Sequence, residues 1–75
     1  MARWEAQRWL VHPFQGRELV AYSSGTDEEY ANERAIGYAE ALMAAGFELE
    51  LVDGDGVHAT KGGEKFVICV REMEV

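Results

Sequence analysis

The sequence predicts a single small α+β domain in which one helix packs across one face of a mostly antiparallel sheet. Residues 27–45 carry the start and stop signals of a helix. On both sides of that segment, short stretches alternate between apolar and polar residues or are continuously apolar over the length of a strand. Glycine-containing turns separate these stretches. We therefore expect residues 1–75 to form one domain with the element order ββαβββ.

The first two predicted strands, residues 4–12 and 18–23, should form a hairpin. Alternation places Trp4 and Leu10 on one face of the first strand, and Trp9 and Val11 on the other. The intervening turn contains Pro13 together with a glycine, which are both strong strand breakers. Because neither face is purely polar, we expect at least one tryptophan to be partly exposed.

The predicted helix has recognisable ends. Thr26 is the expected N-cap, and Glu29 can complete a capping box by reaching back to it. Gly46 suits the left-handed position that follows a helix, and Phe47 can fold back onto the last turn. Steps of 100° per residue gather a stripe of mostly small apolar residues that should face the sheet. The stripe consists of Ala31, Ala35, Tyr38 and Leu42, flanked by Ala39 and Ala45.

The strand predicted at residues 47–52 alternates cleanly. Its apolar positions Phe47, Leu49 and Leu51 should point into the core, and Glu48 and Glu50 should point into solvent. This pattern is typical of a strand with one wet face.

Two further strands are predicted at residues 57–60 and 65–71, separated by glycine turns. The second is apolar on both faces, which is typical of a central strand or of one covered by a partner. We expect Cys69, within this strand, to be buried and slow to react.

The charge of the chain is concentrated in its middle. The net charge is −7, and residues 26–55 hold nine acidic residues against one base, Arg34. Such a surface repels nucleic acid and anionic lipid and is attracted to basic surfaces. We therefore expect no direct nucleic-acid binding and no membrane association. The single cysteine, the absence of a signal peptide and the absence of a long apolar run favour a cytoplasmic protein.

The sequence contains partial matches to cofactor and metal motifs, but each lacks residues or elements that the motif requires. The segment at residues 54–59 matches a GxGxxA fingerprint, but no helix follows it, as dinucleotide binding requires. Asp53, Asp55 and Glu64 have the spacing of calcium-loop positions 1, 3 and 12. However, Val57 and His58 stand where an oxygen ligand and a glycine are needed. No paired cysteine or histidine spacing is present. We expect no cofactor and no metal.

Catalytic arrangements are similarly weak. Cys69 lies in the most apolar strand, and Ser23 and Ser24 lack the glycine elbow of a nucleophile. We expect no enzymatic activity. A small-ligand or enzyme domain that uses the turn from Asp53 to His58 remains one alternative, with His58 as the base.

The leading hypothesis is a non-catalytic acidic protein that docks on a basic, nucleic-acid-binding surface of a larger protein and blocks it. Carboxylates along one face can imitate phosphates electrostatically and accelerate association. The helix face opposite the apolar stripe and the wet face of the strand at 47–52 supply the predicted contact residues. These are Glu29, Glu33, Glu40, Tyr30, Ile36, Glu48 and Glu50.

In its small size, its acidity and its lack of motifs, the chain resembles phage-encoded inhibitors of bacterial machinery, including anti-CRISPR proteins. This resemblance rests on size and charge alone, and no family motif can be quoted from the sequence. It implies a nucleic-acid-mimic inhibitor. A second hypothesis is a self-associating structural domain, because one helix covers only one face of the sheet and the other face can pack on a second copy as a homodimer.

Overall fold

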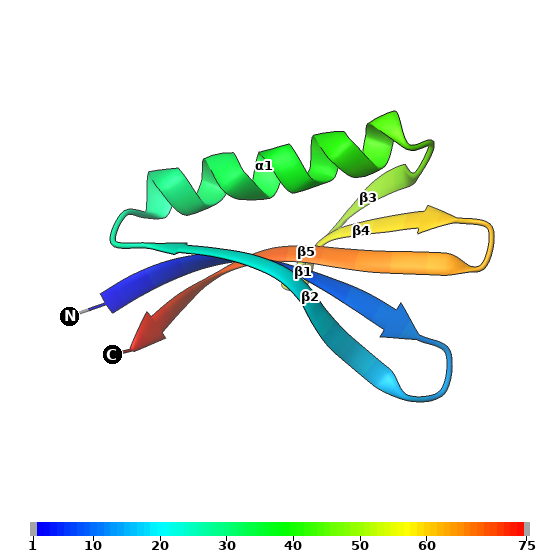
Figure 1. Ribbon diagram of the computed structural model, residues 1–75, viewed down its shortest axis with the longest axis horizontal. Coiled ribbons are helices and arrows are strands. Elements are labelled where there is room, and N and C mark those ends of the chain that lie inside the picture. Colours follow the sequence, from blue (N-terminus) through cyan, green and yellow to red (C-terminus); the bar gives the residue numbers. More distant parts are fainter. Residues whose placement is uncertain (1, 75) are drawn as a thin grey trace.

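A computed structural model describes residues 2–74, which form a five-stranded antiparallel sheet with one helix across one face (Figure 1). The observed order confirms the predicted ββαβββ arrangement of one α+β domain. The elements are β1 (Ala2–His12), β2 (Gly16–Gly25), α1 (Glu28–Ala44), β3 (Glu48–Val52), β4 (Gly56–Lys61) and β5 (Glu64–Glu74). Within the described residues, no helix is long and apolar enough to cross a membrane.

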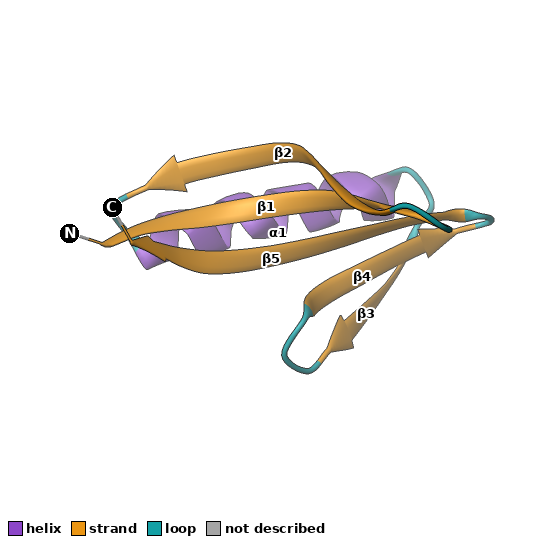
Figure 2. Ribbon diagram, turned by 90° about the horizontal axis from the view of Figure 1, so that it is seen from below, coloured by secondary structure: helices purple, strands orange, loops and turns teal. Residues whose placement is uncertain are grey.

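Strand β5 occupies the centre of the sheet, as its apolar sequence predicted. The strand order is β2-β1-β5-β4-β3, so β5 joins the β1–β2 hairpin to the β3–β4 hairpin (Figure 2). It pairs with β1 over nearly its whole length, from Ala2 opposite Glu74 to Leu10 opposite Phe66. Val67 and Ile68, which point to opposite faces, are both buried.

The N-cap of α1 is Asp27, so the predicted cap at Thr26 is wrong. The Asp27 carboxylate accepts a hydrogen bond of 3.0 Å from the backbone N–H of Glu29. Aspartate caps a helix as well as threonine does, and its charge also interacts favourably with the helix dipole. The capping box drawn from Thr26 to Glu29 is therefore replaced by a cap one residue later.

The C-terminus of α1 ends as the sequence predicted. Gly46 adopts a left-handed φ of 96°. Its N–H donates to the carbonyl of Met43, and the N–H of Phe47 donates to the carbonyl of Leu42, both at 3.0 Å. These two bonds define a Schellman motif. They turn the chain so that Phe47 packs into the same buried cluster as Leu42.

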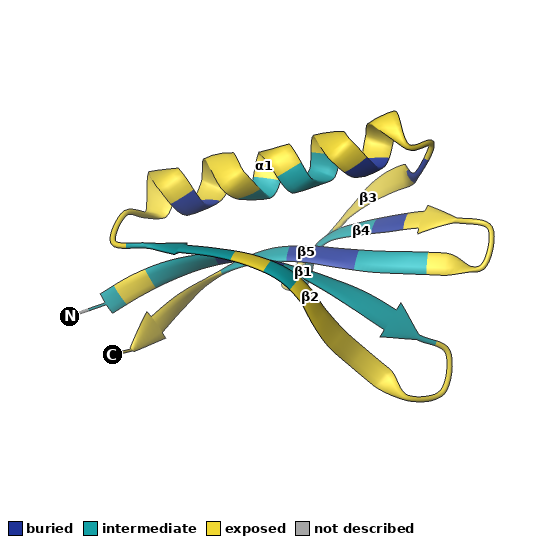
Figure 3. Ribbon diagram, viewed as in Figure 1, coloured by how far each residue is buried: buried dark blue, intermediate teal, exposed yellow. Residues whose placement is uncertain are grey.

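The core lies between α1 and the sheet, where Figure 3 marks buried segments on the helix and on β4 and β5. Its buried members are Leu42, Phe47, Ala59 and Ile68. The predicted stripe of α1 faces this core: Ala31 and Leu42 are buried, and Ala35, Tyr38 and Ala39 are partly buried. Only Ala45 departs from the prediction, because it is the exposed C-cap residue beyond the last turn.

Two leucines of β3 point to the helix side of the sheet, as predicted, but they are not buried in the core. Leu49 lies opposite Ala59, so it does point to the helix side of the sheet, but it is exposed. Leu51 lies opposite Val57 and is 82% exposed. The reason is that β3 is the edge strand. Alternation sets the direction of a side chain, but the reach of the covering helix sets its burial.

Cys69 is half-buried, whereas we expected it to be buried. The last pair between β4 and β5 joins Val57 to Ile68. Gly56, the first residue of β4, lies against Ile68 and Cys69, so this side of β5 is open only beyond Cys69.

Candidate functional site

The outward side of α1 carries the acidic residues that the helical spacing predicted. Glu29, Glu33 and Glu40 are all exposed. The ion pairs found among residues 2–74 join His12 to Glu18, and Asp55 to Arg17 and His58, so they include no carboxylate of α1 or β3. The negative charge of these elements therefore faces solvent without a bound cationic side chain.

Two large side chains flank the helix glutamates on different sides. Ile36 is 58% exposed and lies one turn from Glu33 and from Glu40. Tyr30 is 43% exposed, and its ring rests on Gly25 of β2, where an added Cβ would lie 2.9 Å from the ring. Tyr30 is thus held against β2, whereas the side chain of Ile36 is mostly exposed and reaches the opposite flank of α1.

The two predicted glutamates of β3 lie on a different face of the molecule. Glu48 is opposite Thr60 and Glu50 is opposite His58, so both point away from α1. This follows from alternation, because the leucines between them take the helix side. The structure therefore brings Glu29, Glu33 and Glu40 together but separates Glu48 and Glu50 from them.

An apolar groove, which the sequence reasoning missed, runs along one flank of α1. Its volume is about 450 Å³. Small residues of the helix and branched residues of the strands line it, chiefly Ala35, Ile36, Ala39, Val57, Ile68 and Val70. The alanines of the stripe were a partial signal, because small side chains leave space between a helix and a sheet. The length mismatch between β4 and β5, which opens the groove, was not readable from the sequence.

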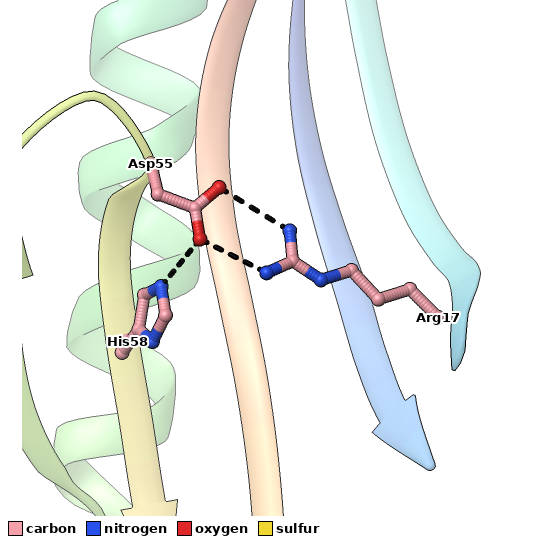
Figure 4. A network of polar contacts seen from close by, with 3 residues as sticks. All are labelled: Arg17, Asp55 and His58. Atoms are coloured by element: carbon pink, nitrogen blue, oxygen red, sulfur yellow. Dashed lines mark hydrogen bonds and ion pairs between the residues drawn. The ribbon is translucent and has the colours of Figure 1, made fainter. Parts of the chain in front are cut away.

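The uncovered face of the sheet is crossed by a network of three charged or titratable side chains (Figure 4). Arg17 Nη1 and Nη2 lie 3.3 and 2.9 Å from the two carboxylate oxygens of Asp55. Nε2 of His58 lies 2.8 Å from Asp55 Oδ2. The hydrogen bonds from Arg17 and then from His58 hold the pKa of Asp55 well below its usual range, and Asp55 raises the pKa of Arg17.

A second polar chain lies on the same face and is centred on the buried side chain of Gln7. The Gln7 amide donates to Glu5 Oε1 at 2.7 Å. Its carbonyl oxygen accepts from Trp9 Nε1 at 3.0 Å and from Cys69 Sγ at 3.4 Å. These bonds satisfy the buried amide and engage the thiol.

The turn from Asp53 to His58 has a structural role in this geometry. Asp55 binds both His58 and Arg17, and thereby ties the turn to β2. Among the described residues, the hydrogen bonds place no hydroxyl or thiol beside His58. No group of three or more His, Cys, Asp or Glu residues within 2–74 is placed to hold a metal ion.

Comparisons of the chain with protein-family models, with curated proteins and with solved structures each find no match. Function is therefore inferred from the surface and geometry of this chain alone.

Proposed function

We propose that this protein is a non-catalytic binding protein whose acidic α1 surface docks on a basic, nucleic-acid-binding surface of a larger protein and blocks it. The supporting observation is the set of exposed helix carboxylates, Glu29, Glu33 and Glu40, which form no ion pair within the described chain. A site that binds phosphates with lysine and arginine attracts such carboxylates for the same electrostatic reason.

The arrangement of charge along α1 favours long-range attraction. The rise of a helix places Glu29 and Glu33 roughly 6 Å apart along its axis, and Glu33 and Glu40 roughly 10 Å apart. The first turn is also acidic, and the last turn has no basic residue that would offset the charge at that end. The exposed carboxylates of the helix outnumber its one base, Arg34, which donates to Ser23 on β2, and this excess of negative charge accelerates association with a basic partner.

Short-range affinity needs apolar contact as well, and Ile36 supplies it in the middle of the acidic surface. Its side chain is more than half exposed between Glu33 and Glu40. A large aliphatic side chain in the centre of an interface, surrounded by polar groups, is a typical anchor. Tyr30, which rests on Gly25, extends the surface towards β2.

Self-association through the uncovered sheet face is the less favoured alternative. A second copy packed flat on this face would have to bury the Arg17–Asp55 ion pair, which lies across it (Figure 4). Removing both charges from water is costly, and the pair already satisfies itself without a partner.

The proposal is tested by capturing partners from a cytoplasmic lysate with the immobilised protein at low and at high salt, followed by mass spectrometry. A nucleic-acid-binding protein that is captured at low salt and released at high salt is the expected result. A bacterial defence nuclease as the captured protein would identify the inhibitor as one of the anti-CRISPR type. The variant with Glu29, Glu33 and Glu40 all changed to lysine is the matched control. Capture that is the same for both proteins and insensitive to salt would contradict the proposal.

A further inference from the structure

The central strand is longer than one of its two neighbours. Strand β5 extends to Glu74, and β1 accompanies it to Ala2. On the other side, β4 pairs with β5 only from Glu64 to Ile68. Gly56, the first residue of β4, lies against Cys69, but among the described residues no strand pairs with residues 70–74 on that side, and Figure 2 shows the β3–β4 hairpin diverging from β5. Alternate backbone N–H and C=O groups of this segment are therefore available to a further strand.

The position of Gly56, the first residue of β4, limits how far β4 covers this edge. Gly56 has a left-handed φ of 81°, and a Cβ at this position would collide with the carbonyl oxygen of Ile68. The backbone at Gly56 therefore lies tightly against β5 at the point where the pairing of β4 with β5 begins. Asp55, one residue earlier, is held by Arg17 on the uncovered face. This ion pair holds Asp55 and its turn toward the uncovered face, where the turn borders a hollow beside Val70 and Arg71.

Space for side chains exists on both sides of the open edge. The apolar groove lies on the helix side, against Ile68 and Val70. A second hollow of about 400 Å³, lined by Asp55, Cys69 and Arg71 among others, lies at the same edge beside the turn. Alternate residues of an added strand would point into these two hollows in turn.

The side chains of β5 specify the chemistry of the occupant. Val70 lines the apolar groove, and Glu72 and Glu74, which follow it on the same face, are exposed. In an antiparallel pair, directly opposite side chains share a face, and opposite charges stabilise the pair. An aliphatic residue therefore fits opposite Val70, and lysine or arginine fits opposite Glu72 and Glu74.

We propose that residues 70–74 of β5 bind an extended basic segment of the partner protein as an added antiparallel strand. Its pattern is basic, any residue, basic, any residue, aliphatic, in the N-to-C direction. The proposal rests on the proposed function, since it gives the basic partner a place where backbone pairing and apolar burial add to charge attraction.

The test is an NMR titration of the ¹⁵N-labelled full chain with the peptide acetyl-Lys-Thr-Lys-Thr-Val-amide at low salt. Two further peptides carry N-methyl groups on alternate residues. One is methylated at the odd-numbered peptide positions and the other at the even-numbered positions. Strand addition predicts shifts at the amides of residues 70–74 and slower exchange of those amides that gain a hydrogen bond. It also predicts that one methylated peptide loses binding while the other keeps it, because only one set of N–H groups faces β5.

Two protein variants separate the charge contribution. Changing Glu72 and Glu74 to lysine should weaken peptide binding on the order of tenfold, since two attractive cross-strand pairs become repulsive. The change Glu64→Lys, on the part of β5 that β4 already covers, should leave binding nearly unchanged.

Three results would overturn the added strand. Equal binding of all three peptides with shifts confined to residues 28–44 would place the peptide on the helix carboxylates, which leaves the proposed function intact. Failure of all three peptides to bind would also reject the added strand. Shifts at residues 70–74 that depend on protein concentration in the absence of peptide would show that a second copy occupies the edge.

Discussion

Arg17 and Asp55 lie 38 residues apart in the chain and form a two-pronged ion pair across the face of the sheet that α1 leaves uncovered. Arg17 stands near the start of β2, at one edge of the sheet, and Asp55 immediately precedes β4 on the other side of β5. The pair therefore ties together the two hairpins that flank the central strand. It also fixes the turn beside the open edge of β5.

Removing this tie should destabilise the fold in a pH-dependent way. The pKa of Asp55 is lowered in the folded state, first by the hydrogen bond from Arg17 and then by that from His58. A lowered folded pKa contributes stability above the unfolded value, about 3.9 for aspartate. This contribution is lost as the pH falls from there towards the folded pKa. Asp55→Asn should thus be less stable than the natural chain at pH 6, and the difference should shrink at pH 3.

Urea denaturation of both proteins at the two pH values measures this effect. Asp53→Asn, in the same turn but without an ion pair among the described residues, is the matched control. A stability difference between Asp55→Asn and the natural chain that is equal at pH 6 and pH 3 would assign the loss to something other than the charge of Asp55.

The buried position of Leu42 predicts a large effect of truncation. Leu42→Ala should lower the free energy of unfolding by roughly 2–5 kcal/mol, because it leaves a cavity in the cluster with Phe47 and Ile68. The neighbouring change Met43→Ala removes a side chain that is 57% exposed and should cost within about 0.5 kcal/mol. Chemical denaturation of the two variants checks this contrast, and similar midpoints for both would show that the helix packs by another face.

The half-buried thiol of Cys69 reports on the open edge of β5. It should react with a thiol reagent in the folded protein more slowly than a free thiol but without global unfolding, since it is partly exposed and bonded to Gln7. The basic peptide should slow this reaction, because Cys69 borders the edge that the peptide would occupy. Labelling followed by mass spectrometry measures the rate. An unchanged rate at saturating peptide would contradict the placement of the peptide there.

Local signals in the sequence were sufficient for the order of elements and for most of the core. The Gly46–Phe47 pair and the stripe containing Leu42 depend only on residues within one helix, so they could be predicted. The cap was misplaced by one residue because Thr26 and Asp27 are both good caps. The exposure of Leu51 depends on the position of β3 at the sheet edge, which no local pattern encodes.

The features that concern function depended on strand order and were harder to predict. The acidic side of α1 follows from helical spacing and was predicted, but Glu48 and Glu50 were assigned to the same surface although they lie on another face. The Arg17–Asp55 tie needs knowledge of which hairpin lies beside β5. The open edge needs the register between β4 and β5, which places Val57 opposite Ile68.

Short-range packing and long-range charge on the acidic surface should separate kinetically. With a captured partner, Ile36→Ala or Tyr30→Ala should speed dissociation with little dependence on salt, since each removes apolar contact. Surface plasmon resonance measures both rate constants. If either variant instead changed only the association rate, its side chain would act before docking and would not be an anchor.

The central claim is that the carboxylates of α1 bring the partner to the protein. Single glutamate changes are expected to matter little, because exposed pairs contribute only about 0.2–1 kcal/mol each. The most direct measurement is the association rate of the captured partner with the variant in which Glu29, Glu33 and Glu40 are lysines, at low and at high salt. The fold should persist, as these residues point away from the core. We predict a strongly slowed association at low salt and a much smaller effect at high salt. A folded variant that associates at the natural rate at low salt would contradict the claim.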